Sequence, residues 1–275
     1  MVRLARIATL RIDVDTWIGL SRGVPKVLRL LRELGIHATF FITMGPDSTF
    51  MNIFRRGSVG YGLKINPFRK YGVNIFAGLI WKPMVGLGNE RVLSLIVKEG
   101  HEIGCHGYNH LLWASKYEKL KATDLLKDLK LALDLMEDRT GLRPLGFAPP
   151  AFKFDAKAAW TVKRLGFLYI SSSRRGSPRV TGGIIQIPVN TLSIEELEVA
   201  GYNKDAILHY YSVIEGEYIG IYVHACYEGR VKVNLLEKVI KLLTGRGFKF
   251  KMMREIAYSL ADRLEDTSNI RSGSY

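Results

Sequence analysis

The sequence predicts an α/β fold, namely a distorted or incomplete (β/α) barrel with about seven or eight parallel strands. The first observation is that short β-like runs alternate along the chain with amphipathic helical patterns, which is typical of parallel βαβ units. The second is the length of 275 residues, which fits one barrel better than two small domains. Local pattern does not fix closure, so an open doubly wound sheet is the alternative.

The individual elements follow from hydrophobic periodicity. Short apolar runs predict strands at residues 5–12, 37–43, 102–105, 145–148, 167–171, 183–187, 218–223 and 248–251. Apolar residues spaced three and four apart predict helices at residues 24–34, 90–98, 123–139, 156–165, 205–214, 235–244 and 254–264. Gly35 and Gly141 mark the ends of two of these helices, as glycines after helices commonly do.

One long segment, residues 48–88, breaks this alternation. It holds six Lys or Arg, no acidic residue and seven aromatic residues. A loop of this length is usually functional or disordered, and the aromatic content argues against disorder. We therefore expect an insertion that either covers the barrel as a lid or docks on a membrane, in which case its basic side chains would meet lipid phosphates. The basic residues expected to do so are Arg55, Arg56, Arg69 and Lys70.

We expect residues 1–264 to form a single catalytic domain that includes this insertion, and residues 265–275 to form a flexible tail. The N-terminal residues read as a first strand rather than a signal peptide. No apolar run approaches the roughly 18 residues of a membrane span. The two cysteines favour a reducing compartment over a disulfide scaffold, so a cytoplasmic location is expected.

The charge is strongly unbalanced, with 40 Lys and Arg against 26 Asp and Glu and a net charge of +14. Such an excess favours anionic partners, which include nucleic acids, anionic lipid headgroups and phosphorylated substrates. No nucleic-acid-binding motif is visible, so nucleic acid is not expected as a partner. No feature of the sequence indicates a protein partner either.

Two acidic residues, Asp13 and Asp15, end the first predicted strand. Side chains two positions apart on a strand point to the same side, so both carboxylates should face one space. In parallel α/β folds, functional sites form at the carboxyl ends of strands. The motif therefore indicates a catalytic or metal-binding role, although two solvated turn acids would give the same pattern.

Three histidines also follow predicted strands. His106 and His110 come just after residues 102–105, and one helical turn would place both imidazoles on one face, which is a common geometry for a divalent metal. With an aspartate as third ligand the site would be open, and Zn²⁺ suits it, as do Mn²⁺, Co²⁺ and Ni²⁺. His224 ends a later strand on the same rim and is a natural proton donor. Packed or surface histidines are the structural alternative.

These motifs together resemble the polysaccharide deacetylase superfamily, the NodB-homology domain of carbohydrate esterase family 4. The resemblance implies a NodB-like barrel that hydrolyses amide bonds. It implies that Asp13 is the general base, that Asp15, His106 and His110 are metal ligands, and that His224 is the general acid. A backbone N–H near Ala151 would help to hold the oxyanion.

Further motifs resemble one branch of that superfamily, the deformylases of a formamido sugar linked to undecaprenyl phosphate. They are RIDVDT at 11–16, GVP at 23–25, MGPD at 44–47, QIPV at 186–189 and HACYEG at 224–229. That branch also carries a basic, aromatic insertion after its GPD motif. The similarity extends from Arg11 to Leu264.

Two departures from the superfamily pattern stand out. The arginine that usually supports the base is absent from the matching stretch Ala148–Ala151, and we expect Lys153 or Arg174 to supply the positive charge. A later strand-end aspartate corresponds to Ser173. The remaining candidates for substrate contact or support of the site are Asp47, Phe152 and Glu228.

The sequence thus predicts a metal-dependent hydrolase that removes an N-formyl or N-acetyl group from an amino sugar. The basic insertion favours a substrate linked to a polyprenyl phosphate, and therefore a peripheral position at the inner face of an anionic membrane. One alternative is a deacetylase of soluble or polymeric N-acetylated glycans of the chitin or peptidoglycan type. A less favoured one is a non-catalytic basic binding protein.

Overall fold

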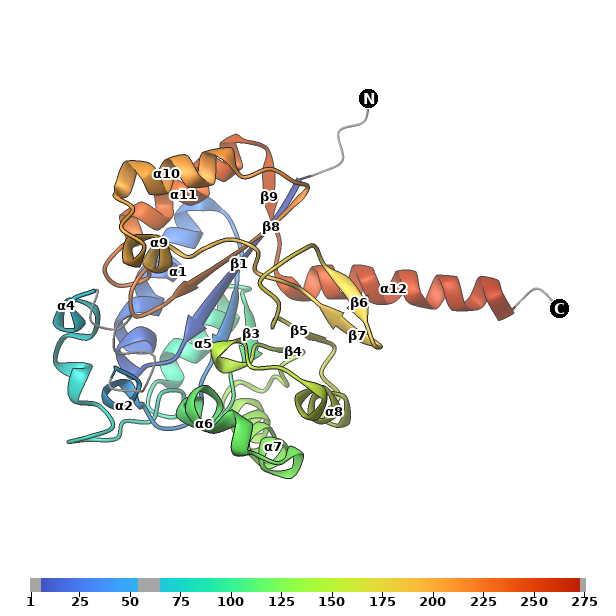
Figure 1. Ribbon diagram of the computed structural model, residues 1–275, viewed down its shortest axis with the longest axis horizontal. Helices are drawn as coiled ribbons and strands as arrows, with labels where there is room; N and C mark the ends of the chain where they lie inside the picture. The colour runs from blue at the N-terminus through green and yellow to red at the C-terminus, as the bar shows by residue number, and fades with distance from the viewer. Residues whose placement is uncertain (1–5, 54–64, 273–275) are drawn as a thin grey trace.

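A single curled sheet lies at the centre of the computed structural model, which describes residues 6–53 and 65–272 (Figure 1). Within these residues the strand order is β6-β7-β5-β4-β3-β2-β1-β8, and β9 also pairs with β1. The strands are β1 (Arg6–Val14), β2 (Thr39–Ile42), β3 (Glu102–Cys105), β4 (Gly146–Phe147), β5 (Tyr169–Ile170), β6 (Arg179–Thr181), β7 (Ile184–Gln186), β8 (Tyr218–His224) and β9 (Phe248–Phe250).

The pairs between strands are parallel except for the short hairpin of β6 and β7. No ladder among the described residues joins β6 to β8 at the two ends of this order. The barrel is therefore incomplete, and the predicted fold class is confirmed.

Most helices lie around this sheet, whereas the last one, α12 (Met253–Ser272), extends away from it (Figure 1). The others are α1 (Val24–Leu34), α2 (Thr49–Ile53), α4 (Pro67–Tyr71), α5 (Glu90–Lys98), α6 (His110–Lys116), α7 (Ala122–Thr140), α8 (Ala156–Arg164), α9 (Ile194–Val199), α10 (Lys204–Val213) and α11 (Val233–Gly245). The bounds of α1 and α5 are those expected from periodicity. In α1 the helix ends because Gly35 adopts a left-handed conformation with φ of 64°.

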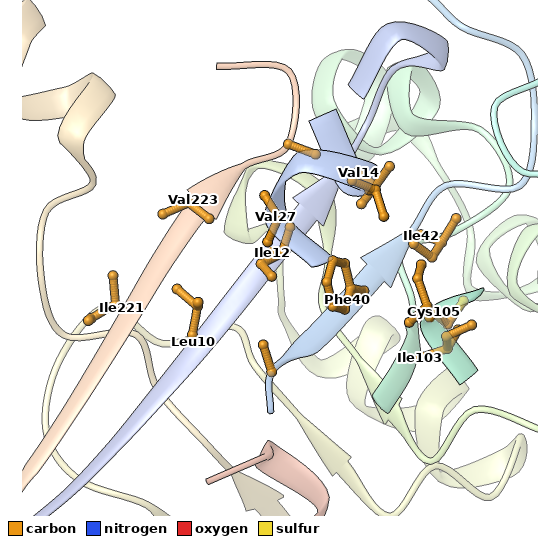
Figure 2. Close-up of a cluster of buried hydrophobic side chains, with 14 of the residues drawn as sticks. Leu10, Ile12, Val14, Val27, Phe40, Ile42, Ile103, Cys105, Ile221 and Val223 are labelled. Atoms are coloured by element: carbon orange, nitrogen blue, oxygen red, sulfur yellow. The ribbon is translucent and has the colours of Figure 1, made fainter. Parts of the chain in front are cut away.

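The two faces of β1 meet different environments. Leu10, Ile12 and Val14 are fully buried and pack with Val27 of α1 in the core between sheet and helices (Figure 2). Because side chains alternate along a strand, Arg11 and Asp13 point to the opposite face, the inside of the curl. One strand thus stabilises the core with one face and supplies polar groups to the site with the other.

The insertion at 48–88 has secondary structure of its own. Besides α2 and α4 it contains the 3₁₀ helix η2 (Gly72–Phe76). Its anchor is the buried carboxylate of Asp47, which accepts hydrogen bonds from the backbone N–H of Trp17 at 2.7 Å and of Thr49 at 2.8 Å, and from the Asn74 amide at 2.8 Å. Asp47, expected near the substrate, is therefore placed where it ties the insertion to the segment after β1.

The C-terminal helix differs from expectation. α12 runs to Ser272 and so extends into residues 265–275, where the sequence suggested a tail. The physical reason is that neither glycine nor proline interrupts the chain between Met253 and Gly273, so no residue in that stretch favours a helix end.

Candidate active site

The carboxyl ends of the parallel strands bring the predicted site residues together. Asp13 on β1 is the register partner of His224 on β8, and Asp15 directly follows β1. His106 directly follows β3, and His110 begins α6. A pocket of about 410 Å³ opens here, with Asp15, His110 and His224 among its lining residues. These five residues, which are spread over more than 200 positions of the sequence, therefore lie close together because parallel strands end at one edge of a sheet.

Asp15, His106 and His110 form a group whose ligand atoms all lie within 4.8 Å of one another. Asp15 Oδ1 is 3.2 Å from His106 Nε2, and Asp15 Oδ2 is 3.7 Å from His110 Nε2. His106 Nδ1 lies 2.6 Å from the Ala148 carbonyl oxygen. Because a carbonyl can only accept, Nδ1 carries a proton, and in the neutral tautomer that metal binding requires Nε2 would offer its lone pair on the side of Asp15.

Two atoms of this group, Asp15 Oδ1 and His110 Nδ1, are buried without a hydrogen-bond partner among the described residues. Buried polar atoms are normally satisfied, so an orphaned carboxylate oxygen beside two imidazoles fits a bound cation. Burial lowers the pKa of His110 to about 4. Burial raises the pKa of Asp15, but the His110 and His106 imidazoles outweigh it and hold that pKa well below its ordinary value. These directions favour the neutral imidazole of His110 and the ionised carboxylate of Asp15, which are the forms that bind metals.

His106 and His110 lie close together, but they are not on one helical turn as the sequence suggested. Gly107, with φ of 81°, breaks the chain direction between them, and α6 starts only at His110. The loop is held by Asp128, which accepts the backbone N–H of Tyr108 at 3.0 Å and the indole N–H of Trp113 at 2.9 Å. The two imidazole centroids are nevertheless 5.4 Å apart.

A second group of possible ligands consists of Glu195, His224 and Glu228. The ammonium of Lys70 pairs with the Glu195 carboxylate, and a positive charge in contact with a ligand opposes a cation there. Of the two groups, Asp15, His106 and His110 are therefore the better candidates for holding a cation.

The Asp13 carboxylate is paired with the side chain of Arg11, a residue that was not among the predicted site residues. Arg11 forms a bidentate ion pair with it, with Nε 2.7 Å from Oδ1 and Nη2 2.7 Å from Oδ2. Arg11 also donates to the Ser171 carbonyl at 2.5 Å, and its guanidinium stacks 4.8 Å from the Phe152 ring centre. Both charged side chains are buried, so the pair fixes the carboxylate rigidly.

The expectation that Lys153 or Arg174 would support Asp13 is wrong. Lys153 pairs with Glu118 at 2.7 Å on the surface, and Arg174 forms a bidentate pair with Glu196 at 2.9 Å. Strand alternation could have identified Arg11, because it stands two positions before Asp13 and so faces the same side.

His224 lies between two carboxylates, those of Asp15 and Glu195. Its Nε2 is 3.9 Å from Asp15 Oδ2, and its Nδ1 is 3.1 Å from Glu195 Oε2. Burial lowers the pKa of His224, but the Glu195 and Asp15 carboxylates outweigh it and raise that pKa to about 9. The two carboxylates therefore favour the protonated form of the imidazole.

Glu195 is the acid that lies beside His224. Ser173, which stands where the superfamily has an aspartate, uses its hydroxyl to donate to the Arg175 carbonyl and to accept the Arg175 N–H. Glu195 lies in the first turn of α9, whose capping box of Ser193 and Glu196 was a readable helix start. The buried carboxylate of Glu228 accepts the backbone N–H of Glu195 and of His224, each at 2.9 Å. Glu228 thus fixes the backbone on both sides of the pair.

Ala151 and Phe152 line the pocket with unusual backbone conformations, with φ of 54° and 56°. Positive φ is costly for residues with a Cβ and tends to be kept at functional sites. The amides of Phe152 and Lys153 donate to the carbonyls of Pro149 and Pro150. The Ala151 amide is therefore the candidate oxyanion donor in this turn.

The remaining candidate residues lie either in the pocket or on the insertion. Arg174 lines the pocket between the rings of Phe152 and Tyr222, at 4.9 and 4.6 Å from their centres. Arg69 is exposed on α4, whereas Lys70 turns inward to Glu195. Arg55 and Arg56 lie outside the described residues.

Comparison with known proteins agrees with this geometry. The family profile described as polysaccharide deacetylase matches residues 9–170. A Shewanella sediminis protein described as a probable 4-deoxy-4-formamido-L-arabinose-phosphoundecaprenol deformylase is 29% identical over 262 residues, which cover 90% of this chain and 84% of that protein. The peptidoglycan deacetylase of Helicobacter pylori is 32% identical over 125 residues, covering 45% of this chain and 40% of that protein.

Among solved structures, the peptidoglycan deacetylase PdaC from Bacillus subtilis superposes with a TM-score of 0.56 at 17% sequence identity, covering 98% of both chains. At that identity the likeness establishes the fold alone. The family match spans more than half of this chain and includes both predicted carboxylates and both loop histidines. The chain therefore belongs to the polysaccharide deacetylase family and is a hydrolase of amide bonds.

Proposed function

We propose that this protein is a metal-dependent deformylase that removes the N-formyl group from an amino sugar linked to a polyprenyl phosphate. The observation that carries the proposal is that the strand ends bring together a buried carboxylate paired with arginine, a trio of possible metal ligands and a histidine 3.1 Å from a carboxylate. The choice of formyl group and lipid-linked sugar is supported by the similarity, over nine-tenths of the chain, to a protein described as such a deformylase.

The trio of Asp15, His106 and His110 would hold a divalent cation, for which zinc is the best fit to its oxygen and nitrogen donors. When bound, such a cation supplies Lewis acidity, which polarises the acyl carbonyl and acidifies the attacking water. The other steps fall to groups of the chain itself.

Asp13 accepts a proton from the attacking water, and the bidentate pair with Arg11 keeps its carboxylate in a fixed orientation. The Ala151 amide donates to the oxyanion of the tetrahedral intermediate. His224, whose Nε2 faces the ligand trio, gives its proton to the departing amine nitrogen. The C–N bond then breaks, and formate and the free amino sugar are released.

The test of this function compares two substrates. The zinc-loaded protein is incubated with a lipid-linked formamido sugar and with N-acetylglucosamine oligomers, and formate and acetate are quantified. We expect formate from the first and no acetate from the second. Acetate release from the oligomers alone would instead favour a glycan deacetylase, the function named for the Helicobacter pylori relative.

The insertion supports the membrane part of the proposal. Its described residues expose several large apolar side chains, including Phe68, Val73 and Ile80, and the basic side chain of Arg69 is exposed as well. An apolar surface with basic residues is suited to the interface of an anionic bilayer. Among the residues that the structure describes, no helix is both long and apolar enough to pass through a bilayer. We therefore propose peripheral docking through the insertion.

Vesicle binding tests this docking. The double variant Phe68→Ser, Ile80→Ser should bind anionic vesicles at least about tenfold more weakly, because each lost side chain forfeits burial worth about 1.5–3 kcal/mol. The measurement is co-sedimentation with phosphatidylglycerol-containing and neutral vesicles. Leu131→Ser on α7, which removes an exposed apolar side chain outside the insertion, is the control. Equal binding of the wild type to both kinds of vesicle would contradict the proposal.

A further inference from the structure

One side chain of the insertion reaches into the active site. The Lys70 side chain on α4 is only 12% exposed, and its ammonium pairs with Glu195, which is 3% exposed. The other oxygen of Glu195 lies 3.1 Å from His224 Nδ1. The insertion, α9 and β8 are thus joined by an unbroken chain of three charged groups that ends at the proton donor.

The backbone around Lys70 is held at both ends of its short helix. The Asn66 side chain accepts the backbone N–H of Phe68 at 2.9 Å and of Arg69 at 3.2 Å at the start of α4. At its end, the Arg230 guanidinium donates to the Lys70 carbonyl at 2.7 Å. Arg230 lies six residues after His224, so the segment that follows β8 fixes the helix that carries Lys70.

The charge of Lys70 compensates an otherwise unfavourable arrangement. Glu195 and Glu228 are both buried, and burial together with Glu195 raises the pKa of Glu228 to about 7. Burial also raises the pKa of Glu195, but Lys70 and His224 outweigh it and lower that pKa to about 2. Without Lys70, only the imidazole would balance the Glu195 carboxylate, and a buried carboxylate that loses a partner tends to move or to take up a proton.

We propose that Lys70 is a positioning residue for the general acid: its ammonium fixes the Glu195 carboxylate, which in turn holds the His224 ring with Nε2 toward Asp15. The insertion therefore completes the acid side of the site in addition to its proposed contact with the membrane. The kinetic part of this inference rests on the proposed function, whereas the geometric part does not.

The chain offers a matched control pair. Lys232 and Glu198 form a second lysine–glutamate pair, with side chains 17% and 20% exposed, and Glu198 follows Glu195 by three residues on α9. Both lysines also lie near the Tyr227 ring, at 5.9 Å for Lys70 and 5.8 Å for Lys232. Of the two pairs, only the Lys70 pair contacts His224, through Glu195.

The first test reads the imidazole directly, by ¹H–¹⁵N NMR of the zinc-loaded full chain labelled at its six histidines. The Nδ1–H resonance of His224, assigned with His224→Gln, should be strongly downfield in the wild type. Lys70→Met should lose or shift it, and Lys232→Met should leave it unchanged. An unchanged resonance in Lys70→Met, or equal shifts in both variants, would overturn the proposal even if no activity were found.

The second test uses leaving groups. A formamide needs a proton on its leaving nitrogen, whereas 4-nitrophenolate departs from 4-nitrophenyl formate without one. Lys70→Met should lower kcat for the formamide by about 10²-fold, with KM and ester hydrolysis changed by less than about threefold. Lys70→Arg should recover most of the loss, and combination with His224→Ala should add little. Equal losses on both substrates would show a merely structural role.

The role of Lys70 can also be tested if the Lys70→Met variant does not fold or if the wild type shows no activity. If Lys70→Met does not fold, the same measurements are made on Lys70→Arg and Glu195→Gln. The first should keep the His224 resonance and the second should lose it, and the reverse order overturns the inference. If the wild type releases neither formate nor acetate from any substrate, the proposed function fails, and the NMR comparison alone decides the role of Lys70.

Discussion

Asp13→Asn is expected to lower the rate of formate release by about 10²- to 10⁴-fold while the protein keeps its metal. Asparagine preserves the shape of the side chain and an acceptor for Arg11, but its amide cannot take the proton of the attacking water. Asp13 is not part of the ligand trio, so cation affinity should change little. Metal content of the purified variant and formate release together measure the effect.

His106→Ala provides the contrasting case, because it removes a ligand whose Nε2 faces Asp15. This variant should lose both metal and activity, whereas Asp13→Asn should lose activity alone. Full activity in Asp13→Asn would show that another group is the base. Loss of metal from it would place Asp13 among the ligands.

Arg11→Met is expected to destabilise the protein by about 3–5 kcal/mol, because it leaves the Asp13 carboxylate buried without its counter-charge. The exposed fractions of the paired side chains are 1% for Arg11 and 5% for Asp13. Urea unfolding, followed by circular dichroism, measures the change in the free energy of unfolding. The double variant Arg11→Met, Asp13→Leu should regain much of the loss, since neither charge is then left in the interior.

A surface pair serves as control for this prediction. Arg139 and Glu90 also form an ion pair, but their side chains are 37% and 52% exposed. Arg139→Met should cost less than about 1 kcal/mol, because water compensates each charge. If Arg11→Met cost no more than Arg139→Met, the buried pair would not be the support of the base that its geometry indicates.

Much of the fold could be predicted because local patterns were clear. The helices α1 and α5 matched their expected bounds, since apolar spacing and a following glycine marked them. The insertion was harder, because α2 and α4 are five residues each and their apolar residues show no helical period. They are held by tertiary contacts such as those of Asp47, which no local pattern reveals.

Some residues of the site could likewise be predicted from the sequence and others could not. The five residues at strand ends could be placed together from sequence, because parallel strands share an edge. Arg11 could have been found from alternation along β1. Lys70 and Glu195 could not, since they are 125 residues apart, and a lysine in a basic segment is indistinguishable from its exposed neighbours until the fold is known.

The position of Arg11 on β1 has a consequence for how the site tolerates change in the rest of the chain. The base and its cation stand two residues apart on a nine-residue strand, flanked by β8 on one side and by β2 and β9 on the other. A shift of one residue in that pairing would turn both charges into the hydrophobic core. The turn at 148–153 contributes the Phe152 ring that stacks on Arg11 but no charge to the pair. A single deletion within β1 would therefore displace the proposed base and its cation together.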